Sequence, residues 1–311
     1  MRVAIIGAGM SGLSCADALT EVGHDIALFD KARAAGGRMS TRRVELPAQT
    51  LQFDHGAQYF TVRDHAFQAK VAGWDRDGVA ARWPAAGSDA WVGTPGMNAP
   101  VKAMADRHKI AWTTRIDALV RHDDVWQLTG DPEEDVFDAV VVAVPAEQAR
   151  PLLDPFQQEF ADAAARSRSA PCWTAMIAFA DPVVTERLIV RDSGAIRWAA
   201  RDGSKPGRGD RQTWIVQASP EWSIEQLERS PEEIAPALLG ALQSALQTPL
   251  PQPVHLSAHR WRYARSDGTS NAGALWDPVT RLGACGDWLI APRAEAAWLS
   301  GLRLAVLMQE V

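Results

Sequence analysis

Three glycines near the start of the chain, Gly7, Gly9 and Gly12, have the G-x-G-x-x-G spacing of a turn that binds a dinucleotide. In such a turn the first glycine permits a tight bend, the second lets the backbone approach a pyrophosphate, and the third lets helix and strand pack closely. The helix that follows would offer unpaired N–H groups and a partial positive charge to phosphate. The alternative is a glycine turn without a ligand. Because strand, turn, helix, second strand and an acidic residue follow in order, the sequence favours nucleotide binding.

The second predicted strand, residues 25–29, leads directly into Asp30, which lies about 20 residues beyond the glycines. An acidic side chain at this place accepts hydrogen bonds from both hydroxyls of an adenosine ribose. This carboxylate argues against a 2′-phosphate on that ribose.

A basic loop, residues 31–43, follows Asp30 and contains the sequence Gly36-Gly37-Arg38. The two glycines would let the backbone turn under a diphosphate, and Arg38 would supply a forked cation for it. The alternative is a solvated basic loop. A glycine pair followed by Arg at this position resembles the extended dinucleotide signature of FAD enzymes in the amine-oxidase-like superfamily, which favours FAD over NAD.

Two phrases of the sequence, G-G-R-M-S-T at residues 36–41 and G-A-Q-Y at residues 56–59, together closely resemble the renalase family of flavin oxidases. The resemblance implies that Gln58 and Tyr59 lie against the flavin. It adds a set of expected FAD contacts, namely Ser11, Lys31, Gly37, Arg38, Met39, His55, Gly56 and Ala57. For His55 and Tyr59 the alternative is a core position at a strand end.

Near the other end of the chain, Gly286-Asp287 follows a predicted strand and precedes a predicted helix at residues 293–309. This pattern resembles the second FAD signature of the superfamily. Asp287 would accept from the ribityl hydroxyls or lie by the pyrophosphate. The helix N-terminus near Arg293 and Ala294 would direct positive charge at the pyrimidine edge of the flavin. Cys285 raises the alternative of a covalent flavin link, but a small residue at a strand end is the simpler interpretation, so FAD is expected to be bound non-covalently.

The renalase resemblance implies hydride transfer to flavin N5 from the 1,2- and 1,6-dihydro isomers of NAD(P)H, with O2 then reoxidising the flavin to give NAD(P)+ and H2O2. The lone pair on the ring nitrogen of such a substrate expels the hydride, so the reaction needs little acid–base catalysis. It depends mainly on how the enzyme positions the substrate. The residues expected to position it are Tyr59, Trp198, Trp261, Tyr263 and Arg197. Six of the thirteen tryptophans fall between residues 171 and 276, which suggests a sheet with an aromatic face that covers a planar ligand; they are Trp173, Trp198, Trp214, Trp222, Trp261 and Trp276. Alternatively, the tryptophans fill a sheet core.

Two competing hypotheses stay open. One is an FAD-dependent amine oxidase or desaturase-type oxidoreductase on the same fold, and the other is a flavin-binding protein without turnover. Amine oxidases of this superfamily typically place a lysine beside flavin N5. The sequence indicates no such lysine, because Lys205 lies in a polar turn rich in glycine and proline and the other four belong to the predicted FAD domain or its connecting helix.

These motifs require a Rossmann-type FAD domain of the p-hydroxybenzoate-hydroxylase-like kind (GR2), with α/β architecture, joined to a discontinuous, β-rich α+β substrate domain. We predict that residues 1–64, 93–168 and 268–311 form the FAD domain and that residues 65–92 and 169–267 form the substrate domain. Local patterns predict an amphipathic helix at 65–83, an acidic turn at 131–135, a buried strand at 137–144, one helix at 231–246 within the substrate domain, and a strand at 280–282.

The amino-acid composition of the chain argues against nucleic acid and membranes as partners. The chain has 311 residues and a formal net charge of −6, which provides no general attraction for nucleic acid. No stretch approaches the roughly 20 apolar residues of a membrane span. The three cysteines, Cys15, Cys172 and Cys285, have neither disulfide-framework nor zinc-site spacing. The sequence therefore predicts a cytoplasmic enzyme without a metal, whose partners are a small dinucleotide substrate and O2.

Overall fold

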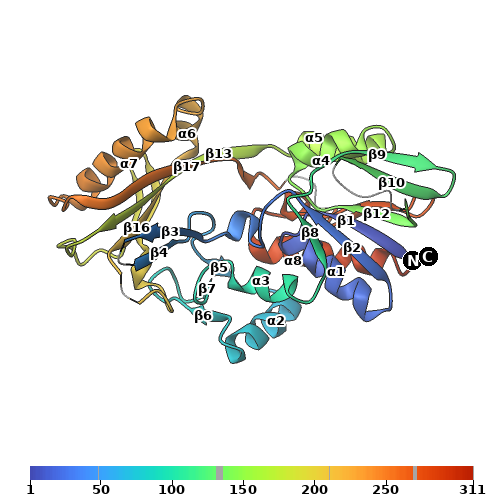
Figure 1. The fold of residues 1–311 in the computed structure, drawn as a ribbon, viewed down its shortest axis with the longest axis horizontal. Helices are drawn as coiled ribbons and strands as arrows, with labels where there is room; N and C mark the ends of the chain where they lie inside the picture. The colour runs from blue at the N-terminus through green and yellow to red at the C-terminus, as the bar shows by residue number, and fades with distance from the viewer. Residues whose placement is uncertain (48, 131–135, 210, 269–271, 311) are drawn as a thin grey trace.

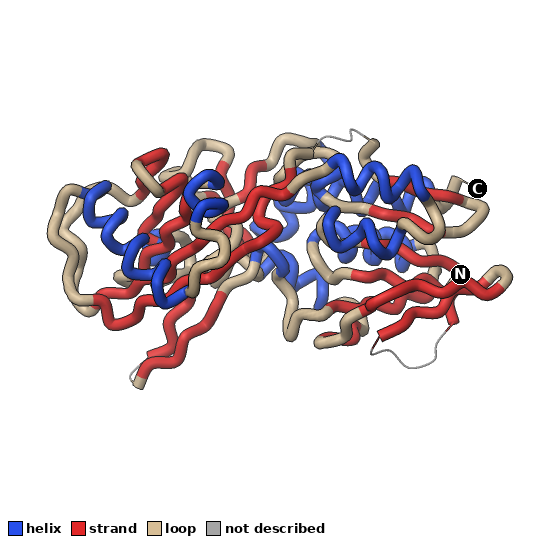
Figure 2. Tube along the Cα trace, turned by 90° about the horizontal axis from the view of Figure 1, so that it is seen from above, coloured by secondary structure: helices blue, strands red, loops and turns tan. Residues whose placement is uncertain are grey.

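The computed structural model describes residues 1–47, 49–130, 136–209, 211–268 and 272–310. The molecule has two lobes along its longest axis, and both marked chain ends lie in the same lobe (Figure 1). One lobe consists largely of strands, and the other consists of helices packed on a sheet (Figure 2).

A six-stranded sheet forms the centre of the lobe that holds the chain ends, with strand order β18-β19-β12-β1-β2-β8. Strand β18 is antiparallel at one edge, and the other strands are parallel. The strands are β1 (Arg2–Ile6), β2 (Asp25–Asp30), β8 (Ile110–Trp112), β12 (Ala139–Val142), β18 (Leu275–Asp277) and β19 (Leu282–Ala284). The strand order reverses direction between β1 and β12, and ligands of such sheets bind at the carboxyl ends of the strands at this switch point. This arrangement confirms the predicted Rossmann-type fold.

Alternate residues of β1 fill two separate cores, because neighbouring side chains of a strand point to opposite faces. Val3 and Ile5 pack on the face covered by α1 and α8, whereas Ala4 and Ile6 pack on the face covered by α4, α5 and a small sheet of β9, β10 and β11. The covering elements are α1 (Met10–Glu21), α4 (Ala146–Leu153), α5 (Gln158–Arg166), α8 (Ala294–Leu307), β9 (Ile116–His122), β10 (Val125–Gly130) and β11 (Val136–Phe137). Helices α1 and α8 cross closely at Gly301, where a Cβ would lie 2.0 Å from the carbonyl oxygen of Ser11.

The other lobe is built on an antiparallel sheet with strand order β14-β15-β16-β13-β17. On one face Trp173 and Ile177 pack in a core with α7, and on the opposite face Met176 packs against the hairpin of β3 and β4. The elements are β3 (Arg42–Leu46), β4 (Gln49–Phe53), β13 (Ser169–Phe179), β14 (Ile189–Ser193), β15 (Ile196–Arg201), β16 (Thr213–Ala218), α6 (Pro220–Glu225), α7 (Pro231–Leu246) and β17 (Pro253–Ser266). This sheet is the β-rich part that the sequence predicts.

A third group of elements follows β4 in the chain and precedes β8. It comprises β5 (Phe60–Thr61), α2 (His65–Arg76), β6 (Ala80–Arg82), β7 (Ala90–Gly93) and α3 (Ala99–Ala105). Phe67, Val71 and Trp74 of α2 recur at helical spacing and pack into the core that also holds α1 and α8. The predicted division of the chain into FAD and substrate domains stays a proposal.

Two predicted elements extend too far. The helix predicted at residues 65–83 ends at Arg76, because the chain turns at Gly78, whose φ is +70°, and then forms β6. The continuous strand predicted at residues 137–144 is interrupted at Asp138, whose carboxylate accepts a hydrogen bond of 2.7 Å from the backbone N–H of Arg2.

Two further predictions on the second half of the chain need correction. The last strand of the Rossmann sheet is Leu282–Ala284 and not residues 280–282, since Leu282 is the residue paired with Val140. The β-rich lobe holds the short helix α6 in addition to α7, and the cap of α6 is Ser219, whose side chain accepts from the N–H of Trp222. The acidic turn predicted at residues 131–135 lies outside the described residues.

Within the described ranges, none of the helices has both the length and the apolar character that crossing a membrane requires. In the same part of the chain, no three His, Cys, Asp or Glu side chains gather as a metal site would require.

Candidate functional site

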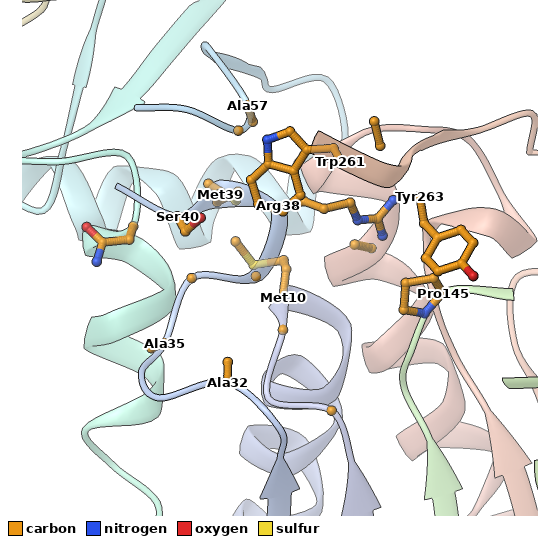
Figure 3. A pocket seen from close by; sticks show the side chains of 18 of the residues that line it. Met10, Ala32, Ala35, Arg38, Met39, Ser40, Ala57, Pro145, Trp261 and Tyr263 are labelled. Carbon is orange, nitrogen blue, oxygen red and sulfur yellow. The ribbon is translucent and has the colours of Figure 1, made fainter. Parts of the chain in front are cut away.

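A cavity of about 2210 Å³ opens at the carboxyl ends of β1 and β12 and extends to β17 of the other lobe. Figure 3 shows that Arg38, Met39 and Ser40 reach it from one loop, whereas Trp261 and Tyr263 reach it from β17. The wall holds most of the residues that the sequence predicts, namely Gly7, Gly9, Ser11, Asp30, Lys31, Gly37, Arg38, Met39, His55, Gly56, Ala57, Tyr59, Arg197, Trp261, Tyr263, Gly286, Asp287, Arg293 and Ala294. Gly12, Gln58 and Trp198 are not part of the wall.

The glycine turn after β1 has the shape of a phosphate-binding turn. Gly7 has a φ of +108°, and a Cβ there would lie 2.5 Å from the carbonyl oxygen of Ala143 at the end of the neighbouring strand. A Cβ on Gly12 would lie 2.0 Å from the carbonyl oxygen of Gly7, so Gly12 permits close packing beneath the turn. At Gly9 nothing lies within 4 Å of the Cβ position, and the same holds at Gly37 across the cavity wall. The backbone is therefore open to a ligand at both of these glycines.

Asp30 is held at the edge of the cavity by two backbone amides. Its Oδ2 accepts from the N–H of Ala8 and its Oδ1 accepts from the N–H of Ala32, each over 2.8 Å. A carboxylate offers about four acceptor sites. The two that remain can accept from the hydroxyls of a ribose.

Arg38 and Asp287 pair with each other. The Arg38 Nη1 and Nη2 atoms lie 2.8 and 2.5 Å from the two carboxylate oxygens of Asp287, and Ser266 Oγ lies 3.3 Å from Asp287 Oδ2. The sequence predicts separate ligand contacts for these two residues, with Arg38 presenting its fork to a diphosphate. In the structure, the fork of Arg38 is occupied by a carboxylate, because the two FAD signatures meet at this point of the wall.

Residues 54–58 form a turn that carries part of the wall. His55, Gly56 and Ala57 border the cavity, whereas the buried side chain of Gln58 points away from it. The Nε2 of Gln58 donates to the carbonyl oxygens of Asp54 (2.5 Å) and Gly56 (3.1 Å). Gln58 thus ties the turn together from behind, which differs from the expectation of a direct flavin contact.

His55, His259 and Trp261 form an aromatic group on the wall. The Nε1 of Trp261 donates to the carbonyl oxygen of His55 over 2.8 Å, and the centroids of the two rings are 5.1 Å apart. The Nη2 of Arg42 lies 3.3 Å from Nδ1 of His259. Since a guanidinium only donates, this nitrogen of His259 is the acceptor and the ring is neutral.

The electrostatic environment favours the neutral form of both imidazoles. Burial lowers the pKa of His55 to about 3, with further lowering by His259 and Arg42. Burial and Arg42 likewise lower the pKa of His259 to about 4. The Nδ1 of His55 is buried and has no hydrogen-bond partner among the described residues.

The remaining predicted aromatic residues have different environments. Trp198 is buried in the core beside Tyr59, with ring centroids 5.3 Å apart, and it supports the wall without reaching it. Arg197 is exposed and pairs with Asp192 over 2.5 Å. Of the six tryptophans expected in the β-rich lobe, Trp261 is the one on the wall, whereas Trp173 and Trp214 pack under α7. The expected aromatic face is thus limited to Trp261 and Tyr263 of β17.

The three cysteines are free thiols. Cys285 is completely buried and lies off the wall, and burial raises its pKa to about 12. Cys172 lies on the wall, and burial raises its pKa to about 11. Neither thiol is a reactive thiolate near neutral pH.

A buried ionic cluster, which the sequence does not predict, lies behind the turn at residues 54–58. It consists of Asp54, Asp202, Lys205 and Arg208, whose side chains are 0 to 4% exposed. The turn that holds Lys205 looks polar and exposed in the sequence. The available signal was the acidic Asp54 inside a phrase rich in aromatic residues, because a charge at such a position needs a buried partner.

The wall of the cavity is strongly basic although the protein is acidic. Among the described residues it contains thirteen Lys and Arg side chains and five Asp and Glu side chains. Four more carboxylates outside the wall pair with these arginines, namely those of Asp89, Asp192, Glu228 and Glu295. When these four are included, an excess of four positive charges remains.

Known flavin enzymes share short stretches with this chain. An L-amino acid oxidase of Cerastes cerastes is 52% identical over 42 residues, which cover 14% of this chain and 8% of the oxidase. A 4,4′-diapophytoene desaturase (4,4′-diaponeurosporene-forming) of Staphylococcus aureus (strain Newman) is 38% identical over 56 residues, which cover 18% of this chain and 10% of the desaturase. The chain thus matches 8 to 10% of the length of these two relatives.

Solved structures match over the whole chain at low identity. A protein provisionally named protoporphyrinogen oxidase from Exiguobacterium sp. 255-15 superposes with a TM-score of 0.77 at 12% identity, covering 100% of this chain and 99% of the other. Cyclohexylamine oxidase from Brevibacterium oxydans IH-35A gives 0.73 at 15% identity, covering 99% and 98%. At such identities the likeness concerns the fold.

Two family models match the chain in sequence. A model described as an NAD(P)-binding Rossmann-like domain matches residues 5–70, and one described as flavin-containing amine oxidoreductase matches residues 84–308. The second match spans more than two thirds of the chain, and the chain therefore belongs to the family of flavin-containing amine oxidoreductases.

Proposed function

We propose that this protein binds FAD non-covalently in the cavity and acts as a renalase-like oxidase of the 1,2- and 1,6-dihydro isomers of NAD(P)H. Bound FAD would supply the hydride acceptor, N5, and would return two electrons to O2, so that one isomer, one proton and one O2 give NAD(P)+ and H2O2. The observation that carries the proposal is the positive charge of the cavity wall. The free thiols are consistent with the reducing cytoplasm, where we propose that the enzyme works.

The chain's own residues fit an FAD diphosphate and ribose. Gly9 and Gly37 leave the backbone open, and the N-terminal end of α1 adds unpaired amides and a partial positive charge. Asp30 keeps two acceptor sites for a ribose beside the same turn. The site therefore has an anion-binding part and a hydroxyl-binding part in the order that the adenosine half of FAD requires.

The charge of the wall favours an anionic second ligand. FAD brings a single diphosphate, whereas an excess of four positive charges faces the cavity. A dihydronicotinamide dinucleotide brings a second diphosphate, and a protonated amine would be repelled by the same field. The cavity of about 2210 Å³ also exceeds the ~300 to 1,000 Å³ of an ordinary single-ligand pocket, which leaves room for two dinucleotides.

The lowered pKa values of His55 and His259 on the cavity wall also favour a substrate that needs no base. An imidazole whose pKa is about 4, such as that of His259, is too weak a base to take a proton from an alkylammonium, whose pKa is about 10. A dihydronicotinamide loses its hydride without such a step. We therefore assign Trp261, Tyr263 and Tyr59 to holding the flat ring and the neutral imidazoles to contacting it.

The test is anaerobic mixing of the yellow holoenzyme with three donors in turn: chemically reduced NAD enriched in the 1,2- and 1,6-isomers, pure 1,4-NADH, and a panel of primary and secondary amines. We expect the isomers to bleach the flavin quickly and the 1,4-isomer slowly, because misplacement of the donor carbon by about 1 Å can cost a hundredfold. Bleaching by an amine with the isomers inert would establish the amine-oxidase alternative instead.

A charge-reversal variant tests the role of the wall. Arg265 is exposed on the wall, so Arg265→Glu should weaken binding of NAD+ and of the isomers and make binding less dependent on salt. Arg76→Glu, at an exposed position at the end of α2 away from the cavity, is the matched control. Equal effects of the two variants on the NAD+ dissociation constant would refute the charge argument.

A further inference from the structure

We propose that Lys205 is a positioning residue of the cavity, which fixes the turn at residues 54–58 through the side chain of Gln58. The proposal rests on the function proposed above, because it takes this turn to be part of the flavin and substrate wall. Lys205 itself does not touch the cavity.

The ammonium group of Lys205 is fully buried and lies close to three side-chain oxygen atoms. Its side chain is 0% exposed, and Nζ lies 2.7 Å from Asp202 Oδ1, 3.2 Å from Asp54 Oδ2 and 3.2 Å from Gln58 Oε1. An ammonium has three N–H donors and no acceptor. Two of these donors have hydrogen-bond acceptors in Asp54 Oδ2 and Gln58 Oε1, and Asp202 Oδ1 forms an ion pair with the ammonium.

The cluster around Lys205 is electrically balanced. Asp54 and Asp202 are matched by Lys205 and Arg208, whose Nη2 lies 2.6 Å from Asp54 Oδ2. Burial alone would raise the pKa of Asp54, but Lys205 and Arg208 hold it well below its usual range. The four groups are thus two ion pairs without excess charge.

Contact with Lys205 decides which way the Gln58 amide faces. Because the ammonium cannot accept, Gln58 must direct its oxygen at Lys205 and its NH2 at the carbonyl oxygens of Asp54 and Gly56. A flipped amide would place its NH2 against the ammonium and its oxygen against two carbonyl oxygens. Lys205 therefore selects the single orientation in which Gln58 holds the turn.

The turn at residues 54–58 is hydrogen-bonded to Arg38 and Trp261 of the cavity wall, so its position affects theirs. The N–H of Ala57 donates to the carbonyl oxygen of Arg38 over 2.8 Å, and the Nε1 of Trp261 donates to that of His55 over 2.8 Å. Gly56 also packs so closely that a Cβ there would lie 2.1 Å from the carbonyl oxygen of Arg38. Loosening of the turn would displace Arg38 and Trp261, which are both drawn on the same side of Ala57 in Figure 3.

Stability alone does not require this arrangement. A buried ion pair often can be replaced by apolar side chains of similar volume without loss of stability, whereas removing one partner is strongly destabilising. The balanced replacement is Lys205→Met with Asp202→Asn, which removes one positive and one negative charge and leaves the pair of Asp54 with Arg208. This variant removes the contact to Gln58 without leaving a buried charge unpaired.

The experiment compares three holoenzymes with the wild type: Lys205→Met/Asp202→Asn, Gln58→Met, and the combination of all three substitutions. We expect the first two to bind FAD, to change the visible spectrum and midpoint potential of the flavin, and to lower its reduction rate by the dihydro-NAD isomers about tenfold or more. The combined variant should be no slower than the slower of the two, because both changes act on the same turn.

Three results would overturn the proposal: a wild-type spectrum, potential and rate in the charge-balanced variant, a wild-type rate in Gln58→Met, or losses that multiply in the combined variant. If the charge-balanced variant Lys205→Met/Asp202→Asn does not fold, the result of Gln58→Met alone tests the proposal, because this substitution keeps all four charged groups of the ionic cluster. The flavin potential is measured by dye-coupled reduction and needs no substrate. A wild type inert to the isomers therefore contradicts the proposed activity, and unchanged potentials in the variants contradict the role of Lys205.

Discussion

Arg38 and Asp287 form a bidentate ion pair between residues that are 249 positions apart in the sequence. The two N–O distances are 2.8 and 2.5 Å, and the carboxylate of Asp287 is buried. Paired N–H donors that match both oxygens of a carboxylate are among the stronger hydrogen bonds of proteins. The pair fastens the loop after β2 to the segment after β19, so that the two ends of the chain enclose one side of the cavity.

Arg38→Met should destabilise the protein and weaken FAD binding together. The substitution leaves the carboxylate of Asp287 buried without its counterion, which costs on the order of 3 kcal/mol. Urea unfolding and FAD titration measure the two effects. Arg76→Met, at an exposed position of α2, is the control, and an unfolding free energy equally unchanged in both variants would contradict the prediction.

Asp30→Ala should yield purified protein depleted of flavin. The substitution removes the acceptor of the Ala8 and Ala32 amides and the expected acceptor of the ribose hydroxyls, and each hydrogen bond to a charged group contributes about 1.5 to 3 kcal/mol. The measurement is the ratio of absorbance at the flavin band to that at 280 nm. Asp25→Ala, at the exposed start of β2, should retain normal flavin content, and full occupancy of Asp30→Ala would show that the ribose is held elsewhere.

Acid or heat precipitation should release all the flavin into the supernatant. Cys285 lies off the wall, and the Cys172 thiol, whose pKa burial raises to about 11, is protonated at neutral pH. Cys172→Ala should therefore bind FAD as the wild type does. Yellow colour that stays in the washed pellet of the wild type and disappears in that variant would reveal a covalent bond.

Stability should fall as the pH is lowered from about 6.5 towards 4. The folded-state pKa of His259 is lowered to about 4, whereas an unfolded histidine has a pKa of about 6.5, so the unfolded chain binds more protons in this window. His259→Asn should reduce the difference in unfolding free energy between pH 7 and pH 5. His65→Asn, exposed at the start of α2, should leave this difference unchanged. A wild-type difference in His259→Asn would exclude the histidine as its source.

The sequence predicts those parts of the site in which backbone chemistry dictates the residue. Gly7 needs a positive φ and Gly12 has no space for a Cβ, so their spacing can be read without a structure. The end of the second strand likewise places Asp30. Each of these constraints is local in the chain.

The parts that the sequence does not predict depend on contacts between distant residues. Gln58 was expected on the flavin but faces Lys205, which lies 147 positions away. Side chains alternate between the two faces along β13 and β16, but this alternation does not show which face packs against α7. The sequence therefore could not tell whether Trp173 and Trp214 lie in the core or face the cavity. A charged residue such as Lys205 can be assigned to the interior once its partners Asp54 and Asp202 are known.

The ion pair of Arg38 with Asp287 also sets an order of events during synthesis. The ribosome makes Asp287 249 residues after Arg38, an interval of roughly 10 to 50 s at about 5 to 20 residues per second. During that time the glycine turn and the first helix exist without α8, which packs against that helix in the finished protein, and without β19, which pairs with β12 in the same sheet. The nascent chain therefore carries an unfinished cofactor site for most of its synthesis, and cofactor loading must await the last segments.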